Sequence, residues 1–134
     1  MNYSCTAKSI AKDKATIKIK QSNIAFGITP ETEATVPNPA ELFLGSLSSC
    51  MLKNVERFSA FMNFSYSTAE ITLNATRLEK PPRIDEIQYT LKIYSPQENI
   101  NIELLKKNIE KHGTIYNTVK EVCAIKGEIE IIKE

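Results

Sequence analysis

The most informative stretch of the sequence reads Asn38-Pro39-Ala40-Glu41-Leu42-Phe43-Leu44-Gly45-Ser46-Leu47-Ser48-Ser49-Cys50. It begins as a helix should. Asn38 suits the N-cap, Pro39 suits the first helical position, and Glu41 suits the third, where its carboxylate can return to the cap. We therefore expect a long helix that runs from Pro39 to about Met62.

The first half of this helix lacks a charged face. No charged residue occurs in Leu42–Leu52, whereas an ordinary surface helix carries charges on its solvent side. The large apolar residues form one stripe, Leu44, Leu47, Met51, Val55 and Phe58. We expect this half to be buried on all sides. Because one small domain has difficulty enclosing such a helix, we infer a second subunit against it.

The composition describes an ordinary globular chain. Its 134 residues are 42% hydrophobic and 25% charged, which excludes disordered and low-complexity classes. The formal net charge of +1 argues against a dedicated nucleic-acid binder. Leu42–Leu52 is shorter than the roughly 20 residues that span a bilayer, and the first residues do not resemble a signal peptide. We expect one domain over 1–134, cytoplasmic, without membrane or nucleic-acid partners.

Alternation of apolar and polar residues predicts the strands. The expected strands are Tyr3–Ala7, Ala15–Lys20, Asn23–Ile28, Ala69–Thr76, Ile87–Ile93 and Glu128–Ile132. Two further helices are expected at Ile102–Lys111 and Ile115–Val122, with Gly113 marking the end of the first. Pro81 and Pro82 are expected in a connection, because proline cannot extend a central strand. The fold class is α+β, with antiparallel N-terminal strands, a long buried central helix and a closing strand.

The cysteines are the main candidates for chemistry. Cys5, Cys50 and Cys123 are odd in number, widely spaced and without a CxxC pair, and the chain has one histidine, so neither a disulfide scaffold nor a zinc site is favoured. We expect no metal and no cofactor. Cys50 is either a reactive thiol, which would need a nearby cation, or a buried small hydrophobe. Cys5 is expected on a strand facing the core.

Three other interpretations stay open at this point. Glu41 is either a catalytic carboxylate or a helix cap, and the capping pattern accounts for it fully. His112 is either a general base or a favourable charge at a helix C-terminus. Cys123 is either a buried residue or a second thiol for Cys50, which would require Cα atoms within about 7 Å.

Asn38–Cys50 resembles the corresponding segment of the OsmC/Ohr family, the osmotically inducible and organic hydroperoxide resistance proteins. The likeness continues in Pro81-Pro82-Arg83-Ile84, in Gly113–Val119 and in the final strand, and the order of elements matches over nearly the whole chain. The resemblance implies an intertwined homodimer with two long central helices. It also implies a thiol peroxidase of the oxidative stress response, in which a first cysteine becomes a sulfenic acid, a second condenses with it, and a dithiol reductant restores the pair.

This sequence matches the family pattern at Cys50 and differs from it at three other positions. Gly113-Thr114 stands where the family has its Cys-Pro pair, and Ala40 stands where it has an activating glutamate. Glu41 is one place away, about 100° round the helix. No arginine precedes Arg57, and Lys8 or Lys18 would supply charge without bidentate geometry.

Two hypotheses follow for function. The first is a homodimeric, thiol-dependent peroxide reductase or redox-active protein using Cys50 at the subunit interface, either with Cys123 as second thiol, with an external thiol, or as a reversibly oxidised sensor. The second is a non-catalytic dimeric module that binds a small hydrophobic ligand in the same pocket.

Overall fold

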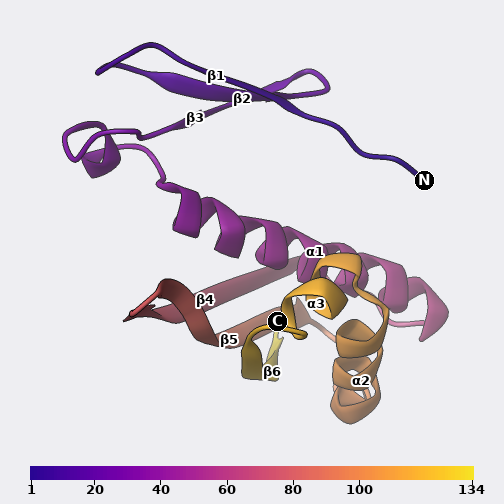
Figure 1. Ribbon diagram of the computed structural model, residues 1–134. Helices are drawn as coiled ribbons and strands as arrows, with labels where there is room; N and C mark the ends of the chain where they lie inside the picture. The colour runs from indigo at the N-terminus through magenta and orange to yellow at the C-terminus, as the bar shows by residue number, and fades with distance from the viewer. The chain divides into compact units, whose positions relative to one another are not determined.

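The computed structural model describes residues 1–134, and its elements follow the predicted order (Figure 1). They are β1 (Thr6–Ser9), β2 (Ala15–Ile19), β3 (Ser22–Phe26), a 3-10 turn (Thr32–Ala34), α1 (Pro39–Phe61), β4 (Thr68–Glu79), β5 (Pro82–Ser95), α2 (Ile102–His112), α3 (Thr114–Val119) and β6 (Ala124–Lys133). The predicted α+β class is confirmed. The chain divides into two compact units, 1–45 and 46–134.

The first unit contains an antiparallel meander in the order β1-β2-β3. The turn between β1 and β2 closes through the Ile10 amide, which donates to the Lys14 carbonyl at 2.8 Å. Almost nothing in this sheet is buried within the chain, since Ala15 is its one buried strand residue. The prediction for Cys5 was wrong: it precedes β1 and is exposed, because the meander has no covered face near it.

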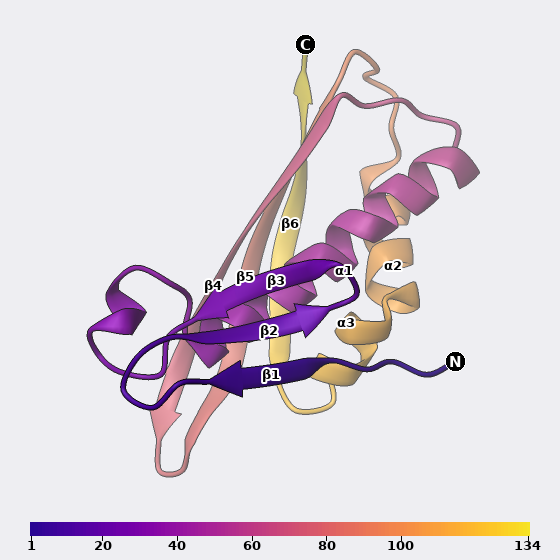
Figure 2. The same cartoon turned by 90° about the horizontal axis from the view of Figure 1, so that it is seen from above.

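The second unit is built on a sheet in the order β4-β5-β6 (Figure 2). β4 pairs antiparallel with β5, and β6 pairs parallel with β5. β5 is central, and its alternate residues form the core of the unit because strand side chains alternate between faces. These residues are Ile87, Tyr89, Leu91, Ile93 and Ser95, each 3% exposed or less.

The proline prediction needs a correction. Pro82 is the first residue of the central strand and pairs with Glu79 across the β4–β5 turn. It is tolerated there because β6 begins to pair with β5 only at Glu86. This end of β5 has one neighbouring strand, so no hydrogen bond to a second strand is lost through the missing amide of proline. Pro81, which follows a cis peptide bond, lies in the turn as expected.

The long helix α1 begins with the predicted capping box. The Glu41 amide donates to Asn38 Oδ1 at 2.9 Å, and the Asn38 amide donates to Glu41 Oε1 at 3.0 Å. Of the apolar stripe, four residues are buried and Leu44 is half-buried; the buried ones are Leu47, Met51, Val55 and Phe58.

Within a single chain, the first half of α1 is not enclosed on all sides. Phe43 is 36% exposed, and a Cβ added to Gly45 would meet nothing within 4 Å. Burial all round therefore stays a prediction that depends on a second subunit.

A tight corner joins α2 to α3. Asn101 caps α2 by accepting a hydrogen bond from the Leu104 amide, and the helix ends at Gly113 with extended backbone (φ −81°, ψ 124°). α3 follows at once, and α2 contacts β6, beside which it lies in Figure 2. None of the helices is both long and apolar enough to cross a lipid bilayer.

Candidate active site

The Cys50 sulfur lies directly against the α2–α3 corner. A Cβ built on Gly113 would stand 2.8 Å from Cys50 Sγ, 3.1 Å from Asn54 Nδ2 and 3.1 Å from the Cβ of Tyr116. Cys50 itself is half-buried, and its thiol is free. The sequence therefore brings together a helix residue and a corner residue that are more than sixty positions apart.

The corner is held in place by its own hydrogen bonds. The Asn117 amide donates to the Gly113 carbonyl at 2.8 Å, and Asn117 Nδ2 donates to the Lys111 carbonyl at 3.0 Å. The second bond bridges the end of α2 and the start of α3. Gly113 is consequently fixed where any side chain on it would press on the thiol.

Asn54 is the site residue that sequence reasoning missed. It follows Cys50 by four positions on α1, so both side chains lie on one face of the helix. Asn54 is 6% exposed and occupies a place among the buried apolar residues of the helix. The available signal was a polar residue at that position, next to Val55 and one turn before Phe58.

Behind the corner, a carboxylate collects two donors. Tyr89 Oη donates to Glu110 Oε2 at 2.6 Å, and Lys106 Nζ lies 2.9 Å from the same oxygen. Burial raises the pKa of Tyr116 to about 12, with the Glu110 charge adding to the effect. Burial and Glu110 likewise raise the pKa of Tyr89.

This cluster ties α2 and α3 to the central strand of the sheet. Tyr89 stands on β5 opposite Gly127 of β6, and its ring lies so close that a Cβ on Gly127 would fall 2.3 Å from Cδ1. Glycine is needed there for close approach. The Tyr89 hydroxyl thus reaches Glu110 of α2 from the central strand.

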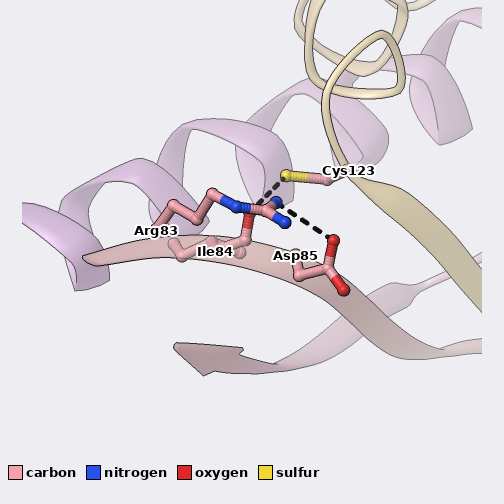
Figure 3. Close-up of polar contacts among 4 residues, drawn as sticks. All are labelled: Arg83, Ile84, Asp85 and Cys123. Carbon is pink, nitrogen blue, oxygen red and sulfur yellow. Dashed lines mark hydrogen bonds and ion pairs between the residues drawn. The ribbon is translucent and has the colours of Figure 1, made fainter. Parts of the chain in front are cut away.

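Cys123 lies in a different environment, between the end of α3 and the start of β6 (Figure 3). Its thiol donates to the Ile84 carbonyl at 3.3 Å, and it is 6% exposed. Burial raises the pKa of this thiol, as does the Asp85 carboxylate, while Arg83 lowers it. Arg83 and Asp85 pair with each other at 3.1 Å. This thiol is held in its protonated, weakly nucleophilic form.

The remaining sequence candidates have structural partners. Glu41 occupies the capping box described above. His112 closes α2, and its ring centroid lies 5.5 Å from that of Phe58. The three cysteines are all free thiols.

A cavity of about 290 Å³ opens elsewhere in the second unit, between the end of α1 and the start of α2. Its lining includes Phe61, Asn63, Asn101 and Leu104, and it includes neither Cys50 nor Cys123. The cavity is therefore separate from the thiol chemistry.

Comparisons with known proteins identify relatives of this chain. The OsmC-like protein family matches residues 30–128. An OsmC-like protein from Mycoplasma pneumoniae superposes with a TM-score of 0.87 at 17% identity, covering 98% of each chain. An organic hydroperoxide resistance protein OsmC from Legionella pneumophila gives 0.69 at 15% identity, covering 96% of this chain and 97% of its own.

A third structure, the organic hydroperoxide resistance protein OhrB of Bacillus subtilis, gives a TM-score of 0.62 at 15% identity over 97% of this chain and 98% of its own. At these identities the structural likeness speaks for the fold. A comparison with curated proteins finds no match.

Proposed function

The chain belongs to the family of OsmC-like proteins, and we propose that it is a thiol-dependent hydroperoxide reductase that acts through Cys50. The observation that carries this proposal is the position of the half-buried Cys50, whose sulfur lies against Gly113 as does the side-chain amide of Asn54. Structural neighbours that are organic hydroperoxide resistance proteins support the substrate class.

The proposed reaction has two halves. The Cys50 thiolate attacks the terminal oxygen of ROOH, an S–O bond forms as the O–O bond breaks, and the leaving alkoxide takes a proton to become ROH. The sulfur is thereby oxidised by two electrons to a sulfenic acid. An external thiol then condenses with it and releases water, and a second thiol equivalent reduces the mixed disulfide.

The reductant must come from outside this chain. Position 113, which touches the Cys50 sulfur, has no side chain. Cys123 is turned to the Ile84 carbonyl, and its pKa is raised, which keeps it out of thiolate chemistry. We propose a dithiol or a low-molecular-weight thiol as the reductant. The cytoplasm is the proposed compartment, because three free cysteines suit a reducing environment.

We further propose that the working form is a homodimer. A three-stranded sheet needs a covered hydrophobic face for stability, yet the β1-β2-β3 sheet buries a single strand residue within the chain. The first half of α1 is uncharged and still partly exposed, at Phe43 and Gly45 above all. A second copy that covers both surfaces would account for them, and sedimentation should find a species of about twice 15.1 kDa.

The enzymatic proposal is tested by hydroperoxide consumption. Purified protein is mixed with cumene hydroperoxide and dithiothreitol, and peroxide loss is followed for the wild type and for the Cys50→Ser variant. Cys5→Ser, which changes an exposed cysteine, is the matched control. We expect turnover in the wild type and the control and none above background in Cys50→Ser; equal consumption by all three would overturn the proposal.

A further inference from the structure

The side-chain amide of Asn54 has no hydrogen-bond partner in the protein, although most of the residue is buried. The residue is 6% exposed, and no hydrogen bond joins its carboxamide to any other group of the chain. The one fully buried side-chain atom without a partner in the chain is Asn117 Oδ1, so the Asn54 amide keeps contact with solvent. Its N–H donors are therefore unused within the protein and open to an incoming molecule.

The amide and the reactive sulfur lie against the same corner residue, Gly113. Asn54 Nδ2 and Cys50 Sγ both lie within about 3 Å of the point where a Gly113 side chain would begin, at 3.1 Å and 2.8 Å. The third nearest atom is the Cβ of Tyr116, which is apolar. Of these three nearest atoms, Asn54 Nδ2 is the one nitrogen that can donate a hydrogen bond to an oxygen.

The helix fixes this pairing. A spacing of four residues places Cys50 and Asn54 one turn apart on the same face of α1. Neighbouring Met51 and Val55 are both fully buried, so the backbone at this level has little freedom to turn the amide away. The nucleophile and the donor therefore both lie against Gly113 before any ligand arrives.

We propose that Asn54 is a substrate-contacting residue of the Cys50 site, which donates a hydrogen bond from Nδ2 to the hydroperoxide oxygen that leaves. This inference rests on the proposed function. As the thiolate bonds to the terminal oxygen of ROOH and the O–O bond breaks, negative charge develops on the RO oxygen, which is then protonated to ROH. A donor fixed at that oxygen stabilises the transition state more than the ground state.

A neutral amide and a cation would affect different reactions of Cys50. A nearby guanidinium would favour the thiolate and so accelerate every reaction of the sulfur. Asn54 carries no charge, so its effect should be confined to reactions that build charge on a substrate oxygen. Alkylation of Cys50 by iodoacetamide expels iodide and provides the contrasting reaction.

The test uses two variants that remove the donor, Asn54→Leu and Asn54→Ala. Leucine fills the space of the amide, while alanine leaves room and favours the helix; thermal unfolding confirms that each is folded. The rate constant for a single oxidation of Cys50 by cumene hydroperoxide is measured beside the rate of alkylation by iodoacetamide. The matched control is Asn74→Asp, at an exposed position on β4.

We expect oxidation to slow at least tenfold in both Asn54 variants, with alkylation and its pH dependence changed less than twofold. Oxidation within twofold of the wild type in either folded variant would overturn the role of Asn54 alone. An equal loss in oxidation and alkylation would also overturn it, since the effect would then lie in the thiol. A wild type that reacts no faster than free cysteine would overturn the proposed function itself, and this inference with it.

Discussion

At the scale of single residues, Gly113 has the most direct consequence for the chemistry. Its missing Cβ would stand 2.8 Å from Cys50 Sγ, close to the roughly 3 Å that separates a Cβ from the partner sulfur in a disulfide. The backbone at Gly113 has φ −81°, which any residue adopts. We predict that Gly113→Cys forms a disulfide with Cys50, seen as a loss of about 2 Da by mass spectrometry.

The neighbouring position provides the control for this disulfide. Thr114 is exposed and begins α3, so Thr114→Cys adds a thiol to the same corner without the contact to Cys50. The cross-link should form in Gly113→Cys and stay absent in Thr114→Cys. Its absence from Gly113→Cys after mild oxidation would mean that the corner does not lie on the sulfur.

Cys123 should matter to stability and not to turnover. Its buried thiol satisfies the Ile84 carbonyl, and its pKa is raised by burial. Cys123→Ala should lower the free energy of unfolding by about 1–2 kcal/mol, as measured by urea denaturation. Hydroperoxide turnover should be unchanged. A loss comparable to that of Cys50→Ser would contradict this prediction and indicate that Cys123 acts as the second thiol.

Single residues differ in how far the sequence predicts them. The capping pair Asn38 and Glu41 was predictable because it depends on local spacing. Cys50 stays a candidate, indicated by the family-like segment before it. Asn54 was not predictable, because an asparagine in a helix is usually solvated, and its burial depends on the distant α2–α3 corner.

At the scale of elements, the N-terminal cap of α1 should contribute measurably to the stability of the protein. Asn38 and Glu41 satisfy one another's amides at the start of a helix of 23 residues. Asn38→Ala should destabilise the protein by about 1 kcal/mol, and Glu41→Ala should have a smaller effect in the same direction. Neither should change the rate of Cys50 oxidation; a large fall in that rate for Glu41→Ala, with the fold intact, would assign it a catalytic role.

The tyrosine cluster that joins α2 and α3 to β5 predicts alkaline sensitivity. Folding raises the pKa of Tyr116 to about 12 and raises that of Tyr89, chiefly by burial and then through Glu110. The unfolded chain therefore loses these protons first, at about pH 10. The free energy of unfolding should be unaffected below pH 9 and should fall as the pH rises from 10 to 12.

The double variant Tyr89→Phe/Tyr116→Phe isolates this effect. Its stability should fall less steeply between pH 10 and 12. The remaining slope has Tyr66 as one source, because burial and Glu56 raise its pKa to about 12. Chemical denaturation at successive pH values measures both slopes, and identical slopes would contradict the role of the cluster.

At the scale of the whole molecule, the order of elements was predictable, and their lengths and pairing less so. Alternation located β4, β5 and β6, but β6 lies parallel to β5, and local patterns do not encode that choice. β5 also reaches back to Pro82, because the β4–β5 hairpin extends beyond the alternating segment. The lack of charge in Leu42–Leu52 predicts a covering second subunit, and one chain by itself leaves that surface partly exposed.

The most direct test of the account is a map of sulfenic acid on the intact protein. Reduced wild-type protein is exposed to one equivalent of cumene hydroperoxide in the presence of dimedone, and labelled peptides are identified by mass spectrometry. We predict that the label appears on Cys50, with Cys123 and Cys5 unlabelled. Label on Cys5 or Cys123 with Cys50 unmodified would contradict the account, because the oxidised sulfur would then lie away from Asn54 and Gly113.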